Sequence, residues 1–236
     1  YCVTFTKLAS TAMKAKLEAL IGAPAKQVRL GTFHALALRW LRSGDSLPPN
    51  HRWNVDQCLE VGKGAIPKQT WIWEAILRGG KIKWSNRGRV GLDIQGKPKD
   101  YALLVDVWRS RRFTVDSPEV LAMVDAAPER ILDAWRLYEE IKADLNAFDF
   151  ADVLDRYAAL NRDRARMIIV DEAQDCAQVQ LDIVKQLAGW SDLKDPAASL
   201  QTAPGRISMF LDIRQSMYSF RGAYPEGILE MLPYSL

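Results

Sequence analysis

Residues Met167 to Asp175 read MIIVDEAQD, and this stretch constrains the fold of the chain more than any other. Four apolar residues run directly into the adjacent carboxylates of Asp171 and Glu172. Such a run suits a buried parallel strand, because helices cover both faces of that strand. Open α/β sheets bind ligands at the carboxyl ends of their strands, where an Asp can hold Mg²⁺ and a Glu can polarise an attacking water. An isolated Asp-Glu pair, however, is more often a strand end followed by a solvated acidic turn.

The size and charge of the chain leave several classes of protein open. Its 236 residues can form one large domain or two smaller ones, and its net charge of +3 permits a nucleic-acid partner without requiring one. The three cysteines lack metal-ligand spacing and fit a reducing cytoplasm. No apolar run approaches the roughly 20 residues that span a bilayer, so we expect a cytoplasmic protein without a membrane partner.

Strands alternate with helices in the first and last parts of the sequence. Strands are predicted over residues 1–6, 28–30, 167–170 and 207–211, and helices over 9–21, 33–42, 129–145, 149–160 and 177–188. The first helix is amphipathic, and Thr32 is the predicted N-cap of the second. This alternation implies a parallel sheet with right-handed crossovers.

The character of the sequence changes at Pro48. From there to about Pro128 the chain carries most of its tryptophans and shows weak periodicity, which predicts an inserted subdomain. Between Arg78 and Lys99 it is irregular and strongly basic, with Asp93 as the one acidic residue. This basic segment could follow the phosphates of a DNA duplex, or it could be merely solvated, as most charge runs are.

Five blocks of sequence stand in order along the chain. They are TFTKLASTAMKAKL at residues 4–17, GTFHALALRWLR at 31–42, NAFDFADVLD at 146–155, IIVDEAQDCAQVQ at 168–180 and LDIRQSMYSFRGA at 211–223. Together they resemble the UvrD/Rep-type DNA helicases of superfamily 1. The resemblance implies an α/β fold, namely a RecA-like P-loop NTPase parallel sheet flanked by helices, with an inserted mainly helical subdomain. It also implies a motor that uses ATP and Mg²⁺ on single-stranded DNA and duplex junctions.

The resemblance assigns the chemistry of the ATP site to three residues. Asp171 is expected to order Mg²⁺, and Glu172 is expected to act as the general base for the attacking water. Gln215 is expected to sense the γ-phosphate, because an amide can both donate to phosphate and accept from water. Outside its block, Gln215 would be read as a surface residue. Gln174 and Asp175 complete the acidic block and are expected to fix its loop.

The two opening blocks match blocks that contact DNA in the family. Thr4, Phe5 and Thr6 resemble the block that grips the DNA backbone and a base, since hydroxyls can donate to phosphate without reading sequence. The same residues could simply end a strand. Thr32 and His34 belong to the second of these blocks, although a His in the first turn of a helix is otherwise usually solvated or capping.

The last block carries Tyr218, Phe220 and Arg221. In the family, the aromatic at the position of Phe220 stacks on a base of single-stranded DNA, which an aromatic face can do for any base. Tyr218 and Phe220 could instead be core residues, and Arg221 could contact phosphate or hold an interdomain network. Asp149 and Asp152 match a further segment of the family, and we predict that it packs the inserted subdomain onto the core.

Two parts of the family pattern do not occur in the sequence. The phosphate-cradling loop, GxxGxGK followed by Ser or Thr, is absent, and so are the blocks of the second RecA-like domain. The chain also begins with Tyr1 instead of Met. We therefore expect a fragment that neither hydrolyses ATP nor unwinds DNA alone, and whose missing partner is a carboxy-terminal RecA-like domain.

These observations lead to one reading with two alternatives. Residues 1–47 and 146–236 are predicted to form the RecA-like ATPase domain, and residues 48–145 the inserted subdomain. The function expected is that of an ATP-dependent DNA helicase of DNA repair or replication, moving 3′ to 5′ as the resemblance implies. The alternatives are the motor of a RecB/AddA-like helicase–nuclease and a non-catalytic DNA-binding remnant of a split helicase gene.

Overall fold

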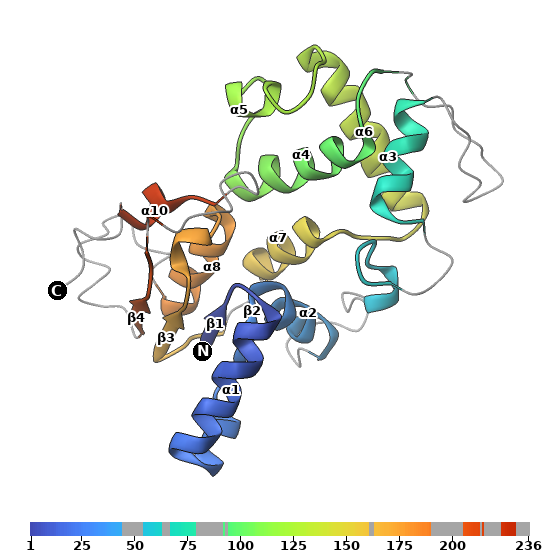
Figure 1. The fold of residues 1–236 in the computed structure, drawn as a ribbon. Helices are drawn as coiled ribbons and strands as arrows, with labels where there is room; N and C mark the ends of the chain where they lie inside the picture. Colours follow the sequence, from blue (N-terminus) through green and yellow to red (C-terminus); the bar gives the residue numbers. More distant parts are fainter. Residues whose placement is uncertain are drawn as a thin grey trace. The chain divides into compact units, whose positions relative to one another are not determined.

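The computed structural model describes residues 1–43, 54–62, 67–78, 92, 94–160, 163–189, 205–212, 214 and 223–229. The chain divides into two compact units (Figure 1). Residues Tyr1–Gly44 and Leu154–Leu236 form the first unit, and Asp45–Val153 form the second. The domain limits at residues 47 and 145 that the sequence suggests remain predictions. None of the helices in these described ranges is both long and apolar enough to cross a membrane.

A parallel sheet of four strands is the centre of the first unit (Figure 1). Its strands are β1 (Cys2–Thr4), β2 (Leu30–Thr32), β3 (Met167–Val170) and β4 (Arg206–Met209), in the order β2-β1-β3-β4. Every neighbouring pair is parallel. The predicted parallel α/β sheet is confirmed, and the carboxyl ends of all four strands therefore lie along one edge.

Helices of the first unit pack on this sheet, namely α1 (Lys7–Ile21), α2 (Phe33–Ser43) and α8 (Gln178–Ala188). The helix α10 (Pro225–Leu229) contacts α8, and α7 (Phe150–Leu160) spans the boundary between the two units. The helix α8 contacts β3 and β4, where Ile168, Leu181 and Val184 are fully enclosed. Burial of such aliphatic side chains contributes about 1.5–3 kcal/mol each and anchors the strand that carries the acidic block.

The first two strands differ from the sequence prediction in their limits. The strand expected over residues 1–6 ends at Thr4, because the Thr6 side chain accepts a hydrogen bond from the Ala9 backbone N–H and caps α1. The strand expected over residues 28–30 begins only at Leu30. Residues Ala23–Gln27 form a 3₁₀ turn, η1, and the Val28 N–H is used to close that turn.

The helix α1 forms as predicted, but its apolar face is not enclosed. It contacts β1, β2 and η1, and none of its residues is buried. Leu8 is 82% exposed and Leu20 is 81% exposed. Helical spacing of apolar residues therefore identifies the helix correctly here, yet it does not establish that the apolar face is covered.

The second unit is mainly helical. Its helices are α3 (Gln69–Leu77), α4 (Pro98–Arg111), α5 (Pro118–Leu121) and α6 (Pro128–Asp144), with a 3₁₀ turn, η3, at Val55–Gln57. Aromatic rings from three helices form its core, since Trp73 stacks on Tyr138 with ring centroids 4.6 Å apart and lies 5.3 Å from the ring of Tyr101. Ile131 and Ile141 are enclosed in α6, which forms close to the predicted limits.

Candidate functional site

The carboxyl ends of the strands bring the described members of the predicted site to one edge of the sheet. Thr4 lies opposite Thr32 in the register of β1 and β2. Asp171 follows β3 directly, and its backbone N–H donates to the Val3 carbonyl oxygen at 2.9 Å. Asp212 follows β4 after a short connection. Residues that are far apart in the sequence therefore meet at this edge, where open α/β sheets bind ligands.

The acidic pair at the end of β3 stands in a sharp turn. Asp171 is half-buried and Glu172 is exposed. The backbone of Glu172 has φ 53° and ψ 43°, in the left-handed region, which is uncommon for residues other than Gly and costs about 1 kcal/mol or more. Two backbone hydrogen bonds hold this turn, from Asp175 N–H to the Glu172 carbonyl and from Ala173 N–H to the Phe210 carbonyl. Such strain is characteristic of functional sites whose surroundings enforce it.

Gln174 lies behind the acidic pair and is 1% exposed. Its Nε2 donates to Glu172 Oε2 at 2.6 Å, and its Oε1 accepts from the Asp212 backbone N–H at 3.1 Å. Gln174 and Asp175 are both buried within the short 3₁₀ turn η4 (Ala173–Asp175). The contact with Asp212 joins the ends of two neighbouring strands, and inspection of the sequence does not find it.

The turn after β1 places its three predicted DNA-contacting residues in different surroundings. Thr4 is 1% exposed, and its hydroxyl donates to the Thr6 carbonyl oxygen at 3.1 Å. Its hydroxyl therefore shapes the turn. Thr6 is exposed but uses its oxygen to cap α1, whereas Phe5 is half-buried between them. Phe5 and Thr6 are thus the accessible members of this group.

The turn after β2 repeats this arrangement. Thr32 Oγ1 accepts from the Ala35 backbone N–H at 3.2 Å, which confirms Thr32 as the N-cap of α2. Phe33 is enclosed in the core, and His34 is half-buried. Desolvation by burial lowers the pKa of His34 from 6.5 to about 4, so its imidazole is uncharged at neutral pH. A neutral His34 can donate one hydrogen bond but brings no positive charge to a phosphate.

The two halves of this edge differ in their electrostatics. The helices α1 and α2 begin at the ends of β1 and β2, and neither has an acidic residue in its first turn. Backbone N–H groups at a helix N-terminus, together with the helix dipole, favour anions. Next to them, the end of β3 presents Asp171 and Glu172. One half of the edge therefore suits phosphate, and the other half suits a cation and an activated water.

The remaining predicted site residues fall in an undescribed segment. Gln215, Tyr218, Phe220 and Arg221 lie outside the described residues, as does most of the basic segment between Arg78 and Lys99. Their roles stay predictions.

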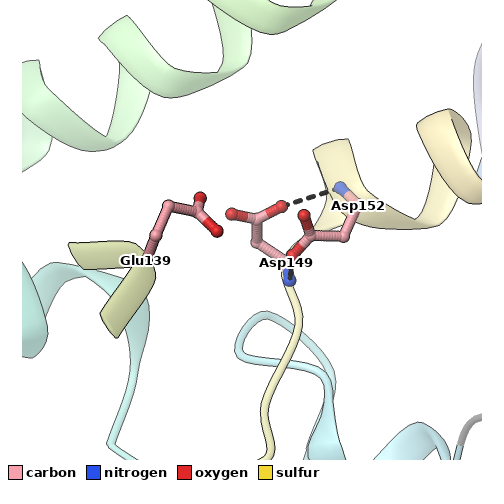
Figure 2. Close-up of side chains that lie close together, drawn as sticks. All are labelled: Glu139, Asp149 and Asp152. Atoms are coloured by element: carbon pink, nitrogen blue, oxygen red, sulfur yellow. Dashed lines mark hydrogen bonds between the residues drawn. The ribbon is translucent and has the colours of Figure 1, made fainter. Parts of the chain in front are cut away.

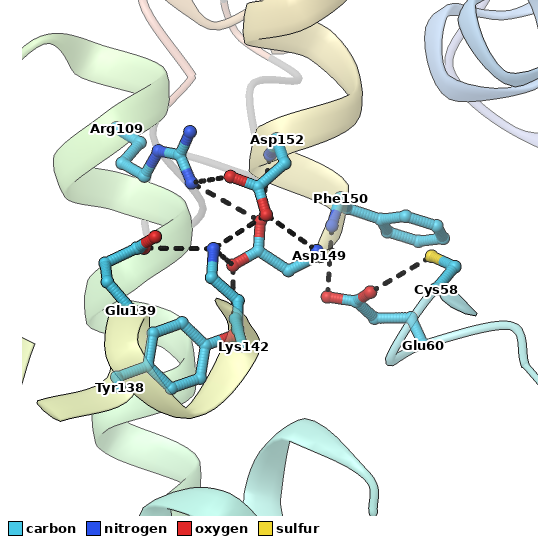
Figure 3. Close-up of polar contacts among 9 residues, drawn as sticks. All are labelled: Cys58, Glu60, Arg109, Tyr138, Glu139, Lys142, Asp149, Phe150 and Asp152. Atoms are coloured by element: carbon cyan, nitrogen blue, oxygen red, sulfur yellow. Dashed lines mark hydrogen bonds and ion pairs between the residues drawn. The ribbon is translucent and has the colours of Figure 1, made fainter. Parts of the chain in front are cut away.

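The second unit contains a network of buried charges around Asp149 and Asp152, whose partners the sequence does not predict (Figure 3). Asp149 and Asp152, at the start of α7, accept hydrogen bonds from Arg109 of α4 and from Lys142 of α6. Lys142 Nζ lies 3.1 Å from Asp149 Oδ2 and 2.6 Å from Asp152 Oδ2. Tyr138 also donates to Asp149, at 3.0 Å. The network ties α4 and α6 to the first turn of α7.

The same carboxylates have the spacing of metal ligands. Glu139, Asp149 and Asp152 each place an oxygen within 4.8 Å of the others (Figure 2). Lys142 Nζ contacts all three carboxylates, including Glu139 Oε1 at 2.9 Å. Burial lowers the pKa of Lys142, but the three negative charges outweigh burial and raise the pKa overall. The ammonium therefore already supplies the positive charge that a metal ion would bring.

Glu60 borders this network (Figure 3). Its carboxylate accepts from the Phe150 backbone N–H at 3.2 Å and from the Cys58 thiol at 3.4 Å. Although part of the residue is exposed, desolvation of the carboxyl group and the nearby charge of Asp149 raise the pKa of Glu60 to about 7. These interactions lie within the second unit, so the predicted packing of this segment onto the ATPase core stays a prediction.

Comparison with known proteins places this fold and site in a class. Residues 1–233 match the family described as UvrD/REP helicase N-terminal domain. The chain therefore belongs to the UvrD/Rep helicase family, and the predicted RecA-like fold class is confirmed.

Three relatives show how much of a longer protein is matched. The chain is 28% identical over 242 residues to YjcD of Bacillus subtilis strain 168, which covers 97% of the chain and 27% of YjcD. It is 26% identical over 236 residues to ATP-dependent DNA helicase UvrD1 of Mycobacterium tuberculosis strain H37Rv, covering 94% of the chain and 28% of UvrD1. It is 28% identical over 251 residues to ATP-dependent DNA helicase UvrD2 of the same strain, covering 97% and 31%. The chain thus spans less than a third of each relative.

Proposed function

We propose that the chain is the amino-terminal motor portion of a longer ATP-dependent DNA helicase, which couples ATP hydrolysis to movement on single-stranded DNA and to unwinding of duplex junctions. The observation that carries this proposal is the edge of the sheet, where an acidic pair adjoins two helix N-termini that favour phosphate. The relatives support it, because two of them are named ATP-dependent DNA helicases. Because such a helicase acts on cellular DNA, we also propose that the protein is cytoplasmic.

In this proposal Asp171 and Glu172 have different roles in hydrolysis. The half-buried carboxylate of Asp171 would hold Mg²⁺, since carboxylate oxygen is a preferred ligand of that ion. The ion would neutralise negative charge on the ATP phosphates when bound. Glu172 accepts the proton of the water that attacks the γ-phosphate, and Gln215 reports the state of that phosphate.

The neighbouring half of the edge would hold the DNA backbone. Thr6 and Thr32 begin helices whose first-turn N–H groups can donate to phosphate, and Phe5 and Phe220 provide aromatic faces for bases. His34, Tyr218 and Arg221 complete this proposed contact, and Thr4 acts indirectly by fixing the turn. None of these contacts requires a particular DNA sequence.

A substitution of the proposed base tests this function. In the full-length protein that carries this chain, Glu172→Gln should leave ATP affinity within about threefold of wild type. DNA-stimulated hydrolysis should fall by about 10²–10⁴-fold, because a glutamine cannot accept the proton. Glu226→Gln, at an exposed acid in the first turn of α10, serves as a control and should hydrolyse ATP normally.

The results also separate the alternatives. Unchanged hydrolysis in Glu172→Gln would show that another group is the base. A wild-type protein that binds single-stranded DNA without any effect of ATP would favour the non-catalytic remnant. Translation of the encoding DNA upstream of Tyr1 should reveal the phosphate-cradling loop in frame, and unwinding of duplexes with a 3′ tail but not a 5′ tail should establish the direction.

A further inference from the structure

We propose that Gln174 is a positioning residue, which fixes the Glu172 carboxylate and couples it to the chain segment that follows β4. The inference rests on the proposed function, in which Glu172 is the general base. Gln174 touches no reacting atom in this mechanism and acts through Glu172.

The geometry of Gln174 supports a bridging role. Its side chain is enclosed, with 1% exposure, while Glu172 is exposed. Its bond to Glu172 Oε2 is short, at 2.6 Å, and its second bond reaches the Asp212 backbone N–H at 3.1 Å, 38 residues further along the chain. One buried amide thereby connects the ends of the neighbouring strands β3 and β4.

The two ends of this amide are not interchangeable. The Asp212 N–H can only donate, so it must face the amide oxygen of Gln174. The NH₂ group of Gln174 then faces Glu172, whose Oε2 must accept. Among the described residues, none hydrogen-bonds to Glu172 Oε1. The bridge therefore holds one carboxylate oxygen and leaves the other for a water molecule.

The bridge also leads toward the proposed phosphate sensor. Asp212 Oδ1 accepts from the Arg214 backbone N–H at 3.0 Å, and Gln215 is the next residue in the sequence. The same amide of Gln174 binds both this segment and Glu172. Displacement of the Asp212 N–H would therefore reorient the donor that fixes the Glu172 carboxylate.

Removal of the amide should impair hydrolysis without impairing binding. In the full-length protein with single-stranded DNA, Gln174→Met keeps the size of the side chain but removes both hydrogen bonds. We expect the single-turnover rate of ATP hydrolysis to fall about 10–100-fold, because small misplacements of a catalytic group carry costs of this order. The Kd for ATP should change less than about threefold.

Gln180 provides a matched control. It is a buried glutamine, 7% exposed, whose Oε1 accepts from the Ala177 N–H at 2.8 Å within the start of α8. Gln180→Met removes a buried amide of the same unit without touching Glu172. We expect its hydrolysis rate to stay within about threefold of wild type. Equal losses in Gln174→Met and Gln180→Met would overturn the proposal.

Replacement of Gln174 by Glu should change the pH dependence of hydrolysis, which a purely structural role of Gln174 would leave unchanged. A protonated glutamic acid can still donate to Glu172 and accept from Asp212, whereas an ionised one repels Glu172. The hydrolysis rate of Gln174→Glu, divided by that of wild type at the same pH, should therefore rise as the pH falls from 8 to 5.5. A ratio that is flat or falls would contradict the bridge.

A double variant distinguishes failure of this inference from failure of the proposed function. If Gln174 acts through Glu172, adding Gln174→Met to Glu172→Gln should cause no further loss of hydrolysis. If the losses of hydrolysis in the two single variants multiply in the double variant, the inference is overturned while the assignment of Glu172 as the base stands. If Glu172→Gln alone hydrolyses ATP at the wild-type rate, the proposed function itself fails.

Discussion

At the first turn of α2, burial holds the imidazole of His34 without charge at neutral pH. The folded chain keeps this group neutral down to about pH 4, whereas the unfolded chain protonates it near pH 6.5. Between these values the unfolded state binds more protons. The free energy of unfolding therefore falls as the pH falls through this window.

This depression of the pKa predicts an effect of substitution on acid stability. Between pH 6.5 and pH 4, the free energy of unfolding of His34→Gln should fall by less than that of wild type. The difference between the two losses should reach on the order of 3 kcal/mol at most. Urea unfolding at several pH values measures the difference. Coincident pH curves for His34→Gln and wild type would show that His34 is not held neutral by the fold.

At the scale of a single element, α6 carries two ion-paired cations, Arg136 and Lys142, in very different surroundings. The Lys142 side chain is 4% exposed and lies among the carboxylates of the network (Figure 3). The Arg136 side chain is 71% exposed and reaches Asp133 at 3.6 Å. Removal of one partner from a buried pair leaves an uncompensated charge, whereas an exposed pair is screened by solvent.

The two cations should therefore respond differently to the same substitution. We expect Lys142→Met to lower the free energy of unfolding by about 3–5 kcal/mol, because Asp149 and Asp152 lose their main counter-ion. Arg136→Met should cost no more than about 1 kcal/mol. Chemical denaturation of both variants tests this contrast, and equal losses would show that the buried network does not stabilise the second unit.

The elements also show which structural signals are local. The strand β3, the capping role of Thr32 and the helix α6 follow from side chains a few residues apart, so the sequence predicts them. The bond between Gln174 and Asp212 joins residues 38 apart, and that between Arg109 and Asp152 joins residues 43 apart. Such partners depend on how elements pack. The periodicity of α1 likewise contains no information about what lies against Leu20.

At the scale of the whole molecule, the parallel sheet joins strands that the ribosome synthesises many seconds apart. The amino group of Tyr1 donates to the Met167 carbonyl oxygen, 166 residues further along, and the second unit accounts for most of that interval. Bacterial and eukaryotic ribosomes add about 5–20 residues per second, so β1 exists for roughly 10–30 s before β3 is made. Among the described strands, β2 is the neighbour of β1 that is made before β3, and two strands of three residues are marginal alone. The strand β1 is therefore a segment that a nascent chain must shield from aggregation.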